Sequence, residues 1–206
     1  MPADLKLVYF NLRGRAEFIR LMLAAAGQKY DEQLVSFEEW PKLKPNTPFG
    51  SLPYIEYKGK TYGQSTAIGP FLAREFGLYG KTNADGCRIA EVSGLWEDQL
   101  TGGLVKSRFG KTDAEKAEAV KKALEEDMPR FFGYYEKFLK ENGSSGFIVG
   151  KALSMADFYI YDMIDSIVAL KSDALKDYPL LQKLKANVEA NPKVKAYLAS
   201  RPKTSF

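Results

Sequence analysis

Stretches with the pattern of a β-strand are confined to the first third of this chain of 206 residues. Four short segments rich in β-branched and aromatic residues are predicted strands: 5–10, 30–35, 52–57 and 60–63. The last two are joined by Lys58-Gly59, a two-residue hairpin turn. Apolar residues at helical spacing predict one helix over residues 16–26 and another, N-capped by Ser65, up to residue 76. The β-α-β-β-β-α order predicts an α/β domain whose first two strands are parallel and whose hairpin forms an antiparallel edge.

No strand pattern follows the Gly-containing linker at residues 77–82. Apolar residues recur at helical spacing instead, in these predicted helices: 89–104, 117–139 with a kink at Pro129, 154–170, 179–190 and 192–199. The chain is therefore expected to have two domains. The α/β domain covers residues 1–77 and an all-helical domain covers residues 82–206.

Composition excludes several kinds of chemistry. The chain has no histidine, so Ser-His-Asp triads, Cys-His nucleophiles and histidine-bound zinc are impossible, and no metal is expected. Cys87 is the only cysteine and can form no disulfide within the chain, so it is interpreted as a passive helix residue. The net charge of +4 is spread along the sequence, which does not favour nucleic-acid binding. No apolar stretch is long enough for a membrane span and no signal peptide is evident, so a cytoplasmic protein is expected.

Three local signals in the α/β domain could form a binding site. Tyr9 ends the first predicted strand and is followed by Arg13, Gly14 and Arg15, so its hydroxyl could donate a hydrogen bond to an anion. A half-buried strand tyrosine with solvated arginines is the simpler interpretation of that segment. The other two signals are a proline turn and the start of a helix.

The proline turn is Gly50-Ser51-Leu52-Pro53, where a cis bond before Pro53 would leave the preceding backbone free to pair with an extended peptide. An ordinary trans proline is the alternative. Gln64-Ser65 opens the next helix, whose N-terminus could bind a carboxylate, although a plain N-cap also explains Ser65. Together the three signals fit a small peptide with a carboxylate and a reactive group near Tyr9.

Five motifs follow one another along the chain: Tyr9-Phe10-Asn11-Leu12-Arg13-Gly14-Arg15-Ala16-Glu17, Trp40-Pro41-x-x-Lys44, Pro48-Phe49-Gly50-Ser51-Leu52-Pro53, Gln64-Ser65 and Met155-Ala156-Asp157-Phe158. Together they resemble the signature of the glutathione transferases. Their details are similar to the sigma class, which includes the haematopoietic prostaglandin D synthase and the cephalopod lens crystallins. The resemblance covers nearly the whole chain and implies a thioredoxin-like domain followed by an all-helical one.

The resemblance also implies roles for individual residues. Tyr9 would be the catalytic hydrogen-bond donor to the sulfur of glutathione, supported by Arg15. The residues implied to bind glutathione, besides these two, are Trp40, Lys44, Ser51, Leu52, Pro53, Gln64, Ser65 and, from a second subunit, Asp98. Ser51 stands where a lysine or glutamine is often found, so its contact with glutathione is expected to be weaker. Because Asp98 would act from a second subunit, a homodimer is expected, with Phe49 as a candidate dimer contact.

A second pocket for an apolar electrophile is implied in part by the helical domain. Its expected residues are Phe10, Arg13, Gly14, Val105, Arg108, Tyr159 and Phe206. Val105 stands about where the prostaglandin synthase has a tryptophan, whereas Tyr159 matches an aromatic residue of that pocket. Asp157, in Ser154-Met155-Ala156-Asp157, is expected to cap a helix rather than to catalyse.

Three functions remain open at this point. The first is conjugation of glutathione, as co-substrate, to apolar electrophiles, as in detoxification. The second is glutathione-dependent isomerisation of a prostaglandin endoperoxide. The third is a non-catalytic, ligand-binding or crystallin-like role, against which the intact Tyr9 motif argues. A thiol-redox enzyme is disfavoured because no cysteine follows the first strand.

Overall fold

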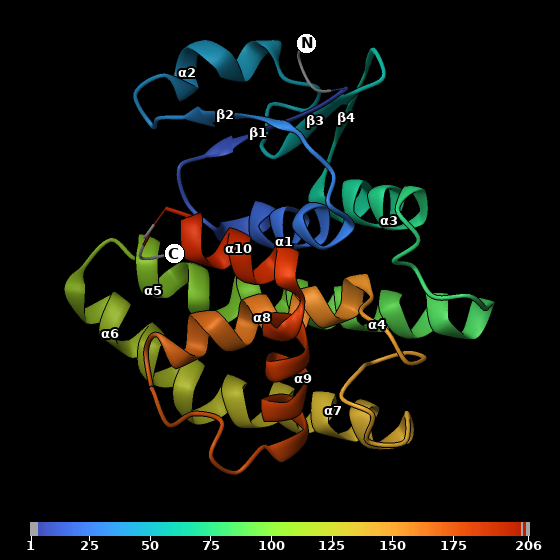
Figure 1. The fold of residues 1–206 in the computed structure, drawn as a ribbon. Helices are drawn as coiled ribbons and strands as arrows, with labels where there is room; N and C mark the ends of the chain where they lie inside the picture. The colour runs from blue at the N-terminus through green and yellow to red at the C-terminus, as the bar shows by residue number, and fades with distance from the viewer. Residues whose placement is uncertain (1–3, 203, 205–206) are drawn as a thin grey trace. The chain divides into compact units, whose positions relative to one another are not determined.

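The computed structural model describes residues 4–202 and residue 204, and the chain divides into two compact units (Figure 1). The first unit contains the residues up to Leu78 and those from Pro192 onward, and the second unit contains Tyr79 to Asn191. The expected thioredoxin-like fold followed by a helical domain is confirmed. The end of the chain differs from the expected domain boundaries. Helix α10 (Pro192–Ser200) packs against α1 (Glu17–Ala26) in the first unit, held by side-chain contacts to Glu17.

A four-stranded sheet organises the first unit. Its strands are β1 (Leu5–Phe10), β2 (Asp31–Val35), β3 (Tyr54–Tyr57) and β4 (Lys60–Gly63), in the order β2-β1-β3-β4. As predicted, β1 is parallel to β2, and β3 and β4 form an antiparallel hairpin. Lys58 and Gly59 both have positive φ, 49° and 76°, as a tight hairpin turn with the twist of a sheet requires.

Helices cover both faces of this sheet. In Figure 1, α1 and α3 (Ser65–Glu75) lie on one face, and the short α2 (Trp40–Leu43) lies on the other. Successive side chains of a strand point to opposite faces, so Val8 and Phe10 face α2 while Tyr9 faces the other side. Both faces of β1 are therefore buried at its centre, and Tyr9 is a buried residue next to the end of the strand.

The second unit consists of helices. They are α4 (Asn83–Gln99), α5 (Val105–Phe109), α6 (Asp113–Lys122), α7 (Met128–Glu141), α8 (Met155–Val168) and α9 (Pro179–Ala190). Helix α8 is buried along almost its whole length and packs against α4 and α9. Within the described ranges, 4–202 and 204, no helix has the length and apolar character needed to cross a bilayer.

Two helices that were expected to be continuous are interrupted by π-helical turns. One lies at Leu100–Leu104, between α4 and α5, and the other at Ala123–Asp127, between α6 and α7. The two turns lie against each other. A Cβ atom on Gly103 would come within 2.9 Å of the Ala123 Cβ, so the backbones approach closely there.

The kink expected at Pro129 stays a prediction. Pro129 is the second residue of α7 and directly follows the π-helical turn at Ala123–Asp127. A proline inside a helix disturbs the hydrogen bonds of the turn before it, which is where this π-helical turn lies.

Candidate active site

The ends of three neighbouring strands meet at one edge of the sheet. Val8 of β1 lies opposite Tyr54 of β3, which lies opposite Gly63 of β4. The residues next to these three along the chain are Tyr9, Pro53 and Gln64. Neighbouring strands are about 4.8 Å apart, so the edge from β1 to β4 spans about 10 Å. This equals the length of an extended tripeptide, roughly 10 Å.

Tyr9 stands at one end of that edge. Its side chain is 5% exposed, and its hydroxyl oxygen accepts a hydrogen bond from the backbone N–H of Arg15 at 2.9 Å. An N–H that donates to a phenol oxygen polarises the hydroxyl and makes its own proton a better donor. The arrangement therefore suits Tyr9 to donate a hydrogen bond to an anion at the sheet edge.

Gly14 allows this contact. Its φ is +39°, and a Cβ atom at this position would lie 2.6 Å from the Tyr9 hydroxyl oxygen. Any side chain here would push the hydroxyl away from the Arg15 N–H. Gly14 and Arg13 are both buried, and their place at the entrance to a second pocket stays a prediction.

Aromatic and apolar side chains pack on the face of the sheet that α2 covers, near the end of β1. Phe10, Trp40 and Leu52 pack partly buried against the cluster of Val8, Val35 and Tyr54. The rings of Phe10 and Trp40 meet edge to face at 5.5 Å between centroids. The structure thus brings together Trp40 and Leu52, two of the predicted glutathione contacts, next to the end of β1.

Lys44 and the proline turn lie close together. The turn of Gly50-Ser51-Leu52-Pro53 precedes β3, and its Leu52–Pro53 bond is cis, as the motif suggested. The Cε atom of Lys44 would lie 3.7 Å from a Cβ atom on Gly50. The exposed Lys44 can therefore place its ammonium group near Ser51, which is half-buried.

The start of α3 corrects one sequence expectation. Ser65 is the first residue of the helix, and the N-cap is Gln64, with φ 70° and ψ 112°. The backbone of Gln64 is left-handed, and its carbonyl oxygen accepts the N–H groups of Ala67 and Ile68. Ser65 is 4% exposed, at the positive end of the helix dipole. Both residues therefore stand where a carboxylate would be stabilised.

The predicted residues from the helical domain lie in the second unit. Asp98 is exposed on α4, while Val105 and Arg108 are half-buried on α5. Val105 lines a groove of about 780 Å³ between α5 and α6, with Phe109, Gly110, Ala114 and Ala119. Tyr159 is fully buried against Trp96, so contact with a substrate would require its neighbours to move. Phe206 lies outside the described residues.

Asp157 has the structural role that was predicted for it. It is fully buried, and its carboxylate accepts hydrogen bonds from the N–H of Ile148 at 2.9 Å and of Ser154 at 2.7 Å. The Ser154 hydroxyl donates a third at 2.8 Å. Burial raises the pKa of Asp157 to about 6, against the opposing effect of these hydrogen bonds. Cys87, by contrast, is exposed on α4.

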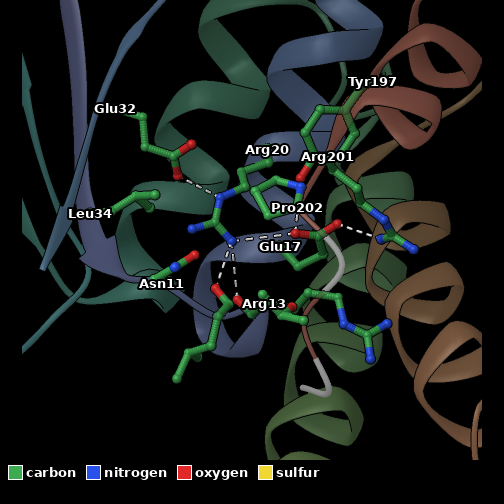
Figure 2. A pocket seen from close by; sticks show the side chains of 11 residues that line it. Asn11, Arg13, Glu17, Arg20, Glu32, Leu34, Tyr197, Arg201 and Pro202 are labelled. Atoms are coloured by element: carbon green, nitrogen blue, oxygen red, sulfur yellow. Dashed lines mark hydrogen bonds and ion pairs between the residues drawn. The ribbon is translucent and has the colours of Figure 1, made fainter. Parts of the chain in front are cut away.

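One group of charged residues near Tyr9 was not predicted. Glu17 and Arg20 of α1 are 1% and 6% exposed and form an ion pair (Figure 2). The Glu17 carboxylate also accepts hydrogen bonds from Tyr197 and Arg201 near the end of the chain. The available signal was the pair of charges three residues apart within an apolar helix. The partners of Glu17 at Tyr197 and Arg201 could not be found from it, since they lie 180 and 184 residues away along the chain.

Comparison with known proteins identifies the family. Residues 5–74 match "Glutathione S-transferase, N-terminal domain", and residues 99–201 match "Glutathione S-transferase, C-terminal domain". The chain therefore belongs to the glutathione S-transferase family. Among residues 4–202 and 204, no cluster of histidine, cysteine or acidic side chains could hold a metal ion.

The relatives agree with the sigma-class resemblance. The chain is 36% identical over 206 residues to hematopoietic prostaglandin D synthase of Gallus gallus, with all of both chains covered. It is 33% identical to S-crystallin SL11 of Nototodarus sloanii, covering 97% of this chain and 98% of that one. A solved structure of monomeric Na-GST-3, a glutathione S-transferase from Necator americanus, is 32% identical and has a TM-score of 0.90. The match covers 98% of this chain and 99% of that one.

Proposed function

We propose that this protein transfers the sulfur of glutathione to apolar electrophiles, with Tyr9 holding that sulfur as a thiolate. The observation that carries the proposal is the sheet edge where Tyr9, Leu52-Pro53 and Gln64-Ser65 lie on neighbouring strands. At this edge the Arg15 N–H donates a hydrogen bond to the Tyr9 hydroxyl oxygen. Full-length membership of the glutathione S-transferase family supports the same activity.

The chemistry requires a thiolate near neutral pH. A free thiol has a pKa of about 8.5 and is mostly protonated there. A hydrogen bond to a charged acceptor is worth about 2 kcal/mol, which would lower the thiol pKa by about 1.5 units. Tyr9 would supply this bond as a neutral donor, and Arg15 would add a positive charge nearby. The remaining acceleration would come from holding thiolate and electrophile together.

The other parts of glutathione would extend along the edge. Its γ-glutamyl carboxylate would lie at the start of α3, where Gln64 and Ser65 stand at the positive end of the helix dipole. The backbone of Leu52 would pair with the cysteinyl unit. Its glycyl carboxylate would be bound by Lys44 and the Trp40 indole N–H, beside Ser51.

The test of this function is an assay with two substrate classes. Purified protein is incubated with an aromatic halide and, separately, with a prostaglandin endoperoxide, each with and without glutathione. We expect conjugation of the halide only when glutathione is present. Isomerisation of the endoperoxide alone would favour the activity named in the Gallus gallus relative. No reaction with either would favour a non-catalytic role.

Lys44→Ala is expected to raise the KM for glutathione about three- to tenfold, with kcat nearly unchanged. The ammonium group would bind a carboxylate remote from the sulfur, so it would contribute to binding equally in the ground and transition states. Steady-state kinetics with glutathione varied would measure this. Lys42→Ala, which removes an exposed charge two residues earlier, in α2, is the matched control and should change neither constant. Equal effects of both variants would contradict the role of Lys44.

Asp98→Ala is expected to raise the KM for glutathione if a second subunit contributes this carboxylate. We propose a homodimer on this basis, and Phe49, 66% exposed, offers an apolar contact. Light scattering at micromolar concentration measures the assembly. The similar Na-GST-3 of Necator americanus is described as monomeric in its crystal structure, so the measurement decides between a monomer like that one and the proposed dimer. A monomeric protein with full activity would contradict the proposed role of Asp98.

A further inference from the structure

We propose that the buried pair of Glu17 and Arg20, anchored by the end of the chain, positions the loop that holds the catalytic Tyr9. This inference rests on the proposed function of Tyr9. It assigns Arg20, Glu17 and Arg201 as positioning residues, because they would act on the reaction through the loop and not by touching the substrate.

Arg20 binds the backbone of the loop directly. Its Nη1 atom donates to the carbonyl oxygens of Leu12 at 2.9 Å and Arg13 at 3.4 Å, and to the carboxylate of Glu17 at 3.3 Å. Its Nε atom donates to Glu32 of β2 at 2.6 Å. Figure 2 shows the guanidinium at the centre of these contacts. One side chain thus links α1, β2 and the loop after β1.

The loop carbonyls are adjacent to the group that contacts Tyr9. The carbonyl of Arg13 and the N–H of Arg15 belong to two consecutive planar peptide units joined at Gly14. Fixing the first carbonyl therefore restricts the direction of the Arg15 N–H, which donates to the Tyr9 hydroxyl at 2.9 Å. A glycine backbone is conformationally permissive, and at Gly14, with φ +39°, the Arg20 contact adds a second donor to the Arg13 carbonyl, which also accepts the Ala16 N–H. Arg20 also lies 5.8 Å from the centre of the Tyr9 ring, within the range of a cation–π contact.

The end of the chain holds the other half of the pair. The Glu17 carboxylate accepts a hydrogen bond from Arg201 Nη1 at 2.6 Å on one oxygen and from the Tyr197 hydroxyl at 3.0 Å on the other. The Glu17 side chain is 2% exposed, and a buried carboxylate needs such partners to remain charged. Burial alone would lower the pKa of Arg20, but Glu32 and Glu17 more than offset this and raise it, so the guanidinium stays charged.

The cavity beside Glu17 and Arg20 is too small to let their side chains rearrange. A cavity of about 40 Å³ lies among Leu12, Arg13, Arg20, Tyr197 and Arg201. This is room for about one water molecule, whose share of liquid volume is roughly 30 Å³. Shortening Arg20 would leave room for water rather than for a new side-chain contact, so the carbonyls of Leu12 and Arg13 would lose a fixed donor.

The test uses three variants of the network and one control. Arg20→Lys keeps the charge but cannot reproduce the planar set of donors. Arg201→Gln and Tyr197→Phe each remove one contact to Glu17. Lys193→Gln is the control, because Lys193 also joins α10 to α1, through the carbonyl of Ala26 at the far end of α1 from the loop.

Two readouts separate positioning from stability. The first is kcat and KM with an aromatic halide, together with the apparent pKa of the bound thiol from the pH profile. The second is hydrogen exchange at the Arg15 amide, which reports the loop whether or not the protein conjugates glutathione. We expect Arg20→Lys to lower kcat about tenfold, to raise the thiol pKa by about one unit and to speed Arg15 exchange, with the KM for glutathione within about threefold.

Arg201→Gln and Tyr197→Phe should shift the same quantities in the same direction by smaller factors, and Lys193→Gln should shift none. The inference is overturned if Arg20→Lys folds with unchanged kcat, thiol pKa and Arg15 exchange. It is also overturned if the control has the same effect as the other variants. If Arg20→Lys fails to fold, the two milder variants decide by the same criteria. Failure of the proposed function would appear separately, as a wild-type protein that does not conjugate glutathione. The Arg15 exchange rates of the variants would still show whether Arg20 positions the loop.

Discussion

Tyr9→Phe is expected to lower kcat/KM for conjugation about 30-fold at pH 6 and to have little effect at pH 9.5. The hydroxyl is proposed to lower the thiol pKa from about 8.5 to about 7, so its loss reduces the thiolate fraction by about 30-fold at a pH below both values. Above both values the sulfur is ionised with or without the donor. The pH profile of kcat/KM with an aromatic halide measures this.

The KM for glutathione should change by less than about twofold in this variant, because most of the expected binding contacts lie elsewhere along the edge. Tyr57→Phe is the matched control. It removes the hydroxyl of a buried tyrosine at the other end of β3, where the hydroxyl donates to Glu75 at 2.9 Å. Full turnover of Tyr9→Phe at pH 6 would contradict the role of the phenol. So would a loss that persists undiminished at pH 9.5, since ionisation would then not be its cause.

The parts of the fold that the sequence predicts are those with local causes. The hairpin at Lys58-Gly59 depends on two adjacent residues, and the strands of the first unit depend on short apolar runs. The gathering of Tyr9, Pro53 and Gln64 follows from the register of these strands. Much of the candidate site was therefore accessible from local patterns together with the five motifs of the resemblance.

Several features were missed for different reasons. At the π-helical turns the backbones of Gly103 and Ala123 approach closely, and no local pattern records this contact. The N-cap at Gln64 requires a left-handed backbone at a residue that rarely adopts one, whereas serine is the usual capping residue. The partners of Glu17 at Tyr197 and Arg201 become visible only when α10 is placed beside α1.

Asp157→Ala is expected to lower the free energy of unfolding by roughly 3–5 kcal/mol at pH 5. The substitution removes the acceptor of three hydrogen bonds, two of them from the buried N–H groups of Ile148 and Ser154. It also leaves the first turn of α8 without its acidic cap, in the most deeply buried helix of the second unit. Urea denaturation at fixed protein concentration measures the change.

The pH dependence of this loss has a definite sign. Burial raises the pKa of Asp157 to about 6, above its value of about 3.9 in the unfolded chain, so the folded state binds the proton more tightly. Its contribution to stability is fully present below about pH 4 and is lost as the pH rises through 6. The difference between wild type and Asp157→Ala should therefore narrow from pH 5 to pH 7.5.

Asp85 provides the opposite case in the same structural motif. Its carboxylate caps α4 by accepting hydrogen bonds from the backbone N–H groups of Lys81 and Thr82. These hydrogen bonds lower the pKa of Asp85. Its contribution is therefore present above about pH 4 and is lost only on acidification. Asp85→Ala should cost markedly less than Asp157→Ala, and the cost should be constant from pH 5 to pH 7.5. If the Asp157 difference instead widens with rising pH, the buried carboxylate is stabilised as the anion, and its hydrogen bonds outweigh its burial.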